Sequence, residues 1–169
     1  MVEQVPGQGQ VFNHNTEGAS AHFLANRKVG HEEENRPGAE DTGGRFTLVE
    51  VEFGPGAGPP PHVHKNEDEA FYVLEGQVDV LDGDRRFTTE PGSFVYMPKG
   101  THHAFKNTGD GFAKILLMFV PAGFEGYMKE FGTPWSPNSI PPESDMATAV
   151  KLAEKYGMTF IDPPPGLWD

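Results

Sequence analysis

Three histidines and one glutamate stand at spacings that would let them bind a single metal ion. His62 and His64 are two residues apart, so in an extended segment both side chains point to the same face. Glu69 follows five residues after His64, close enough to return to it after a short turn, and His103 begins a later β segment. Imidazole nitrogens and carboxylate oxygens bind zinc and similar divalent metals at about 2.1 Å. The candidate metal ligands are therefore His62, His64, Glu69 and His103.

The carboxylate ligand has a rival two residues away. Glu67 has the same parity as Glu69 in an extended segment, so it points the same way. A β-bulge more or fewer in the turn would make Glu67 the ligand instead. The neighbouring His102 alternates away from His103, and we interpret it as a surface histidine.

The donor set limits the kind of metal. Three imidazoles and one carboxylate suit divalent Fe, Mn, Ni, Co, Cu or Zn equally and suit calcium poorly. We expect one such divalent transition metal as the cofactor. If the site is octahedral, two positions stay open for an oxygen-bearing ligand and O2. The chain contains no cysteine, so thiolate ligands and disulfides are excluded.

Short β segments dominate the middle of the chain. After Arg45, alternation places Thr47, Val49, Val51 and Phe53 on one face of a strand. Further strands are predicted at Ala70–Leu74, Gln77–Leu81, Arg86–Thr89, Ser93–Met97, His103–Lys106 and Lys114–Val120. Many short strands separated by Gly and Asp turns predict an all-β barrel or sandwich.

Two short helices are predicted after these strands. The segment Phe124–Phe131 places apolar side chains at i, i+3, i+4 and i+7. This helix could cover the mouth of the barrel as a lid, or pack on its outside or at a dimer contact. The second helix runs from Asp145 to Tyr156, with Ser144 as its cap and Gly157 as its stop.

The chain divides into three parts of one domain. Residues 1–40 are an N-terminal arm, in which a weak pattern over Glu17–Val29 predicts an edge strand. Residues 41–122 are the β-barrel core. Residues 123–169 are the C-terminal helices and a Pro-rich tail packed on the barrel.

The spacing of ten residues resembles the two motifs of the cupin superfamily. The segment Gly56-x5-His62-x-His64-x4-Glu69-x6-Gly76 resembles the first motif. The segment Gly92-x5-Pro98-x-Gly100-x2-His103-x3-Asn107 resembles the second. The resemblance implies a cupin double-stranded β-helix, which is a jelly-roll barrel, here with one or two short C-terminal helices.

Within that superfamily, the chain resembles small single-domain bacterial cupins related to quercetin 2,3-dioxygenases. The resemblance implies a metal-dependent dioxygenase acting on a hydroxylated aromatic or flavonol-like small molecule, with O2 as the second reactant. It also implies that Glu69 is the catalytic general base. Two alternatives are a metal-dependent isomerase, epimerase or lyase acting on a sugar or small acid, and a non-catalytic small-molecule-binding cupin.

The inward positions of the predicted strands would form an apolar substrate pocket or a filled core. They contain neither Lys nor Arg, which disfavours the sugar or small-acid alternative. The predicted pocket residues are Val51, Phe53, Phe71, Val73, Val95, Met97, Phe105, Leu117 and Phe119.

Charge and composition restrict the partners. A formal net charge of −12 disfavours nucleic acid and anionic membrane surfaces. There is no basic and apolar leader and no run of 18 apolar residues, so we expect a cytoplasmic protein that does not enter membranes. The resemblance to cupins also implies a homodimer, in which the segment before Thr47 is added to or exchanged with the partner.

Overall fold

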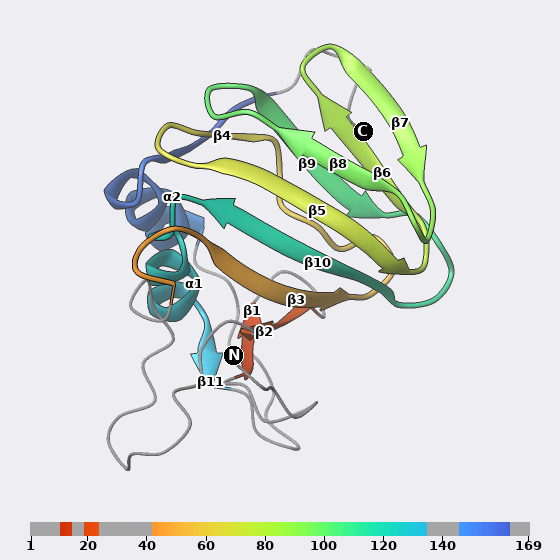
Figure 1. Ribbon diagram of the computed structural model, residues 1–169, viewed down its shortest axis with the longest axis horizontal. Helices are drawn as coiled ribbons and strands as arrows, with labels where there is room; N and C mark the ends of the chain where they lie inside the picture. Colours follow the sequence, from red (N-terminus) through yellow and green to blue (C-terminus); the bar gives the residue numbers. More distant parts are fainter. Residues whose placement is uncertain (1–10, 15–18, 24–41, 135–145, 163–169) are drawn as a thin grey trace.

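Two antiparallel β-sheets face each other in the computed structural model, which describes residues 11–14, 19–23, 42–134 and 146–162 (Figure 1). In sheet order, the first sheet contains β11 (Thr133–Pro134), β1 (Val11–His14), β2 (Ala19–Phe23), β3 (Thr47–Phe53), β10 (Ala113–Val120), β5 (Asp68–Glu75) and β8 (Phe94–Met97). The second contains β12 (Met158–Phe160), β4 (His62–His64), β9 (His102–Asn107), β6 (Val78–Asp82) and β7 (Arg85–Thr89). The helices are α1 (Glu125–Phe131) and α2 (Met146–Lys155). The predicted all-β jelly-roll class is confirmed.

The predicted strands correspond to observed strands with ends shifted by one or two residues. The edge strand predicted within Glu17–Val29 is only half right, because β2 is a strand but lies between β1 and β3 in the interior of its sheet. The strands β1 and β12 were not predicted. Each is three or four residues long, too short for alternation to stand out from chance.

The core lies between the inner faces of the two sheets. Strand β10 shows the alternation clearly, since Ile115, Leu117 and Phe119 are buried while the residues between them are half-buried. Aromatic contacts cross from one sheet to the other: the ring centroid of Phe105 lies 5.9 Å from that of Phe53 and 5.4 Å from that of Phe71. Burying these side chains supplies the main driving force for holding the sheets together.

Two residues of the sequence motifs, Asn107 and Gly76, have structural roles in the backbone and are not candidate metal ligands. Asn107 donates from its amide nitrogen to the carbonyls of Phe53 and Gly111 and accepts from the amide of Gly109, so it joins the end of β3 to the turn between β9 and β10. Gly76 has φ of 80°, and a Cβ atom there would meet the backbone of Ala113 at 2.7 Å. Only glycine fits this close turn.

Both helices lie at one end of the sandwich (Figure 1). The buried carboxylate of Glu125 fixes the start of α1, because it accepts hydrogen bonds from the hydroxyl of Thr47 (2.5 Å) and the amide of Gly123 (2.6 Å). Helix α2 is followed by Gly157 at φ of 76°, as predicted, whereas its predicted cap Ser144 lies outside the described residues. Among the described residues, no helix is both long enough and apolar enough to span a membrane.

Asp79 on β6 ties three neighbouring segments together and gives a test of the fold. Its carboxylate accepts hydrogen bonds from the hydroxyls of Thr88 (2.7 Å) and Thr108 (3.2 Å) and from the guanidinium of Arg86 (3.0 Å). Burial acts to raise the pKa of Asp79, but these hydrogen bonds and the charge of Arg86 lower it below its usual value. The stabilisation is therefore complete above the unfolded-state pKa and is lost as pH falls through the lower folded-state pKa.

We expect Asp79→Asn to reduce the free energy of unfolding by about 1–3 kcal/mol at pH 7, because charged hydrogen bonds are lost. The difference from wild type should shrink below about pH 4, where the wild-type carboxyl also becomes protonated. Urea denaturation at pH 7 and at a pH below about 4 measures the free energy of unfolding of wild type and variant. Asp84→Asn is the control, because that side chain is 91% exposed. An equal loss at both pH values would contradict the assigned role of the charge.

Candidate metal centre

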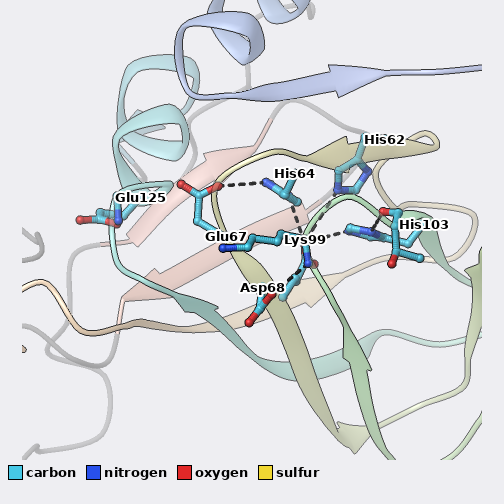
Figure 2. A network of polar contacts seen from close by, with 10 residues as sticks. His62, His64, Glu67, Asp68, Lys99, His103 and Glu125 are labelled. Carbon is cyan, nitrogen blue, oxygen red and sulfur yellow. Dashed lines mark hydrogen bonds and ion pairs between the residues drawn. The ribbon is translucent and has the colours of Figure 1, made fainter.

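The four predicted ligands converge from three strands and both sheets. His62 and His64 point to the same face of β4, and the register of β4 with β9 places His62 opposite His103 (Figure 2). Glu69 reaches them from β5 in the facing sheet. One ligand atom from each residue lies within 4.8 Å of all the others, and all four residues are buried. The structure therefore brings together the whole predicted set.

The carboxylate oxygen Oε2 of Glu69 is the centre of this cluster. It lies 3.0 Å from Nε2 of His64, 3.1 Å from Nε2 of His103 and 3.8 Å from Nε2 of His62. All three rings thus present the same nitrogen, Nε2, to one point. Two ligand atoms that each lie about 2.1 Å from one ion, with an angle of about 90° between them at the ion, are about 3.0 Å apart. The distances from Glu69 Oε2 to His64 and His103 therefore suit ligands of one metal ion.

The backbone sets the orientation of two of the rings. Nδ1 of His62 lies 2.9 Å from the carbonyl oxygen of Pro60, and Nδ1 of His103 lies 2.9 Å from that of Thr101. A carbonyl oxygen only accepts, so each Nδ1 carries the proton and donates it. In the neutral ring, Nε2 then keeps its lone pair, which is the form that binds a metal.

The corner before His103 is held against the first ligand strand. The amide of Lys99 donates to the carboxylate of Asp68 (2.9 Å), as Figure 2 shows, and the amide of Gly100 donates to the carbonyl of His64 (2.8 Å). Gly100 has φ of 84°, which glycine adopts without strain. The next residue, Thr101, supplies the carbonyl that orients His103. This turn therefore places one ligand relative to two others.

His64 differs from the other two histidines because its Nδ1 faces a carboxylate. Oε2 of Glu67 lies 3.7 Å from Nδ1 of His64, an ion-pair distance, and neither atom has a hydrogen-bond partner among the described residues (Figure 2). Glu67 is only 5% exposed. Glu67, weighed above as an alternative ligand, thus lies on the far side of His64 from the cluster. Glu69 occupies the ligand position.

The proton affinities of these groups follow from burial and from each other. Burial lowers the pKa of His62. Burial also opposes protonation of His64, but the carboxylates of Glu67 and Glu69 outweigh it and raise the pKa of His64 to about 9. Burial acts to raise the pKa of Glu69, yet the three histidines, His103 foremost, hold it well below its usual range. The pKa shifts of His64 and Glu69 therefore show that the cluster favours a positive charge beside the Glu69 carboxylate.

These observations fit a metal ion. A neutral imidazole that donates from Nδ1 turns the Nε2 lone pair toward the negative Glu69 oxygen, and this arrangement is repulsive unless a cation lies between them. His64 has buried nitrogens without a hydrogen-bond partner among the described residues. Three imidazoles and one carboxylate are ligands that divalent transition metals accept. The His62, His64, Glu69 and His103 cluster could therefore hold the predicted metal, and its donor set leaves the identity open.

A cavity of about 120 Å³ adjoins the cluster. His62, His64 and Glu69 form part of its wall, whereas His103 does not. Five of the nine predicted pocket residues line it: Val51, Phe53, Phe105, Leu117 and Phe119. The other four, Phe71, Val73, Val95 and Met97, are buried in the core and are not among its described lining residues. Some of the predicted inward-facing residues thus line the cavity, and the others pack in the core.

Sequence reasoning did not assign six lining residues that come from the C-terminal part of the chain. They are Phe124, Tyr127, Met128 and Phe131 on or next to α1, and Met158 and Phe160 on β12. The sequence predicts the apolar face of the first helix but does not decide whether that face covers the barrel mouth or packs elsewhere. The structure places that face over the cavity beside the metal centre. The outward position of His102, 4.0 Å from Asp84, agrees with its alternation.

A family model described as a cupin domain matches residues 49–119. Quercetin 2,3-dioxygenase of Bacillus subtilis is 29% identical over 104 residues, which are 62% of this chain and 31% of that protein. Germin-like protein subfamily 2 member 2 of Arabidopsis thaliana is 33% identical over 78 residues, covering 43% and 36%. The match thus spans about a third of the length of these relatives.

Among solved structures, an RmlC-like cupin from Shewanella frigidimarina superposes with a TM-score of 0.56 at 17% identity, covering 75% of this chain and 96% of that one. Fold and site together define a jelly-roll protein with a buried centre of three histidines and one glutamate. Residues 49–119 of the chain form a cupin domain.

The position of Glu67 predicts an orienting role that substitution can test. Groups that hydrogen-bond the outer nitrogen of a ligating histidine commonly contribute 10-fold to 100-fold to metal affinity. We expect Glu67→Ala to weaken metal binding by about tenfold, and Glu67→Gln to recover part of it because an amide oxygen still accepts from Nδ1. Competition with a chelator measures the affinity, with Glu75→Ala, at the exposed end of β5, as the control. Wild-type affinity in Glu67→Ala would refute the role.

Proposed function

We propose that this chain is a metal-dependent cupin oxygenase, a dioxygenase that acts on a hydroxylated aromatic or flavonol-like small molecule. The observation that carries the proposal is a buried three-histidine, one-glutamate cluster that borders an aromatic cavity. The similarity to quercetin 2,3-dioxygenase of Bacillus subtilis supports the same class of reaction. An apolar wall next to polar ligands suits a substrate that is a ring bearing hydroxyl groups.

Each part of the site has a role in this proposal. A divalent metal held by the four ligands would lower the pKa of a substrate hydroxyl and bring the reactants together. Glu69 stays ionised because its pKa is well below its usual range, and it lines the cavity, so its carboxylate can accept the hydroxyl proton. The aromatic side chains around it exclude water and position the ring.

The two alternatives make different demands on the same site. An isomerase, epimerase or lyase acting on a sugar or small acid needs polar or cationic groups to bind its substrate. The described lining of the cavity contains neither Lys nor Arg, which disfavours this alternative. A non-catalytic binding protein would use the same cavity and ligands, and only a measurement of turnover separates it from an oxygenase.

Metal content and oxygen consumption test the proposal together. Protein purified without chelator or affinity-tag nickel should contain nearly one metal per chain, measured by mass spectrometry. We expect His62→Ala and Glu69→Ala to lose most of the metal, because each leaves an incomplete ligand set. His102→Ala is the matched control, since that ring lies outside the cluster. Oxygen uptake on hydroxylated aromatics and flavonols should follow metal content, and wild-type protein that cannot be loaded with metal would eliminate the oxygenase.

We also propose a homodimer, with the segment before Thr47 at or near the contact. In one chain, β1 and β2 extend the sheet beyond β3, a position that a partner's segment could equally fill. Phe46, 36% exposed directly before Thr47, is apolar surface of the kind that dimers cover. Light scattering should therefore report twice 18.5 kDa, and the variant Phe46→Lys should lower it. A wild-type mass of one chain would contradict the dimer.

A further inference from the structure

The cavity beside the metal centre is closed on one side by a group of apolar residues that we call the cap. The cap consists of the six residues Phe124, Tyr127, Met128, Phe131, Met158 and Phe160. They come from the start and inner face of α1 and from β12, outside the segment that matches the cupin family model. The cap is therefore a feature of this chain's C-terminal part, added to the barrel.

The cap is packed directly against the ligands. The ring of Phe124 meets the ring of His64 edge-on, with centroids 4.3 Å apart, and also contacts Phe119 at 4.9 Å. The rings of Tyr127 and Phe131 continue the stack at 5.1 and 5.4 Å. On the other side, β12 pairs with the ligand strand β4, with Met158 opposite His64 and Phe160 opposite His62.

Polar contacts hold the cap in place from outside. Lys155 at the end of α2 bonds to the carboxylate of Glu130 on α1 at 2.7 Å, and the hydroxyl of Tyr156 donates to the same carboxylate. The ring of Tyr156 also lies against Gly126, where any side chain would collide with it. The two helices and β12 thus form one packed layer over the cavity. The layer sets the size of the space under it.

That space is close in size to a cavity known to hold one aromatic ring. A cavity of about 150 Å³ lined by Leu, Ile and Phe binds benzene. The cavity here, about 120 Å³, is partly open to solvent and encloses space for one aromatic ring, so the other rings of a flavonol would lie outside it.

The chemistry of the lining favours an aromatic ring as well. Apart from the metal ligands, the described lining residues carry only one polar side-chain group, the hydroxyl of Tyr127. Burial raises the pKa of Tyr127 to about 12, so the hydroxyl keeps its proton at neutral pH. A polyol or a carboxylic acid would leave several polar atoms unsatisfied in this space, at a cost in free energy for each.

We propose that the cap restricts the substrate to hydroxylated aromatic compounds with a single ring, and that Phe124 and Met128 are specificity-determining residues. The inference rests on the proposed function for the substrate's hydroxyl groups, which the metal centre would bind. It narrows that function, because it excludes flavonols as the preferred substrate.

Equilibrium binding of a series of diols to the metal-loaded protein tests the size limit without requiring turnover. The probes are 4-nitrocatechol with one ring, 2,3-dihydroxynaphthalene with two fused rings and quercetin with three, each titrated without oxygen and followed by absorbance. We expect wild type to bind 4-nitrocatechol at least about tenfold more tightly than quercetin, a difference of about 1.4 kcal/mol. Equal or tighter binding of quercetin would overturn the inference, whatever the variants do.

One variant and its control test whether the cap sets the size limit on the substrate. Met128→Ala removes a side chain that lines the cavity and should reduce the preference for one ring by about tenfold through tighter quercetin binding. Met118→Ala is the matched control, since this half-buried residue of β10 does not line the cavity and should keep the wild-type preference. An unchanged preference in a folded, metal-loaded Met128→Ala would contradict the role of the cap.

Oxygen uptake separates this inference from the function on which it rests. Selective binding of 4-nitrocatechol without oxygen consumption on any one-ring diol would retain the size limit and reject the oxygenase. Oxygen consumption with quercetin as the best ligand and substrate would retain the oxygenase and reject the size limit.

Discussion

A carboxylate and three imidazoles share one small, buried space, and the cost of this arrangement explains most of the surrounding structure. Taking ionisable groups out of water is unfavourable unless opposite charges, hydrogen bonds or a metal replace the solvent. Glu69 is 2% exposed and has three ring nitrogens within 3.8 Å of one oxygen. The charge of a metal would resolve the repulsion between the carboxylate and the nitrogen lone pairs. The groups around the cluster keep its members from relaxing apart.

Rigidity of the cluster comes from the backbone more than from side chains. Two ring nitrogens donate to carbonyls two residues earlier in the chain, so each ring is oriented by its own segment. The corner at Gly100 is fastened to both Asp68 and His64, and β4 is paired with β9 on one side and β12 on the other. His64 is the exception, because its Nδ1 faces the buried carboxylate of Glu67 at 3.7 Å and has no backbone carbonyl as its partner among the described residues. A site built in this way is preorganised before any ligand arrives.

The C-terminal part of the chain covers the cavity beside the cluster of His62, His64, Glu69 and His103. In a jelly roll of this kind, the end of the sandwich that carries the ligands is open unless another element covers it. Here α1 and β12 cover it with aromatic and Met side chains, and α2 holds them from outside. The same barrel with another C-terminal segment could admit a different molecule. Part of the cavity wall therefore comes from residues outside the segment that matches the cupin family model.

The class of fold, the three histidines of the cluster and two candidate carboxylates could be predicted from the amino-acid sequence. His62 and His64 stand two residues apart, as residues on one face of a strand do, and ten motif positions match at once. The sequence also predicted most strands, because period-two alternation is strong where one face is buried. Only the tertiary structure separated Glu67 from Glu69, since both have the same parity and only the position of β5 against β4 distinguishes ligand from orienting group. Only the tertiary structure shows that β2 lies inside its sheet, that β12 pairs with the ligand strand β4, and that the apolar face of α1 faces the cavity. These outcomes depend on contacts between segments far apart in the chain, and local periodicity, which reports which face of a segment is buried, carries no information about what buries it.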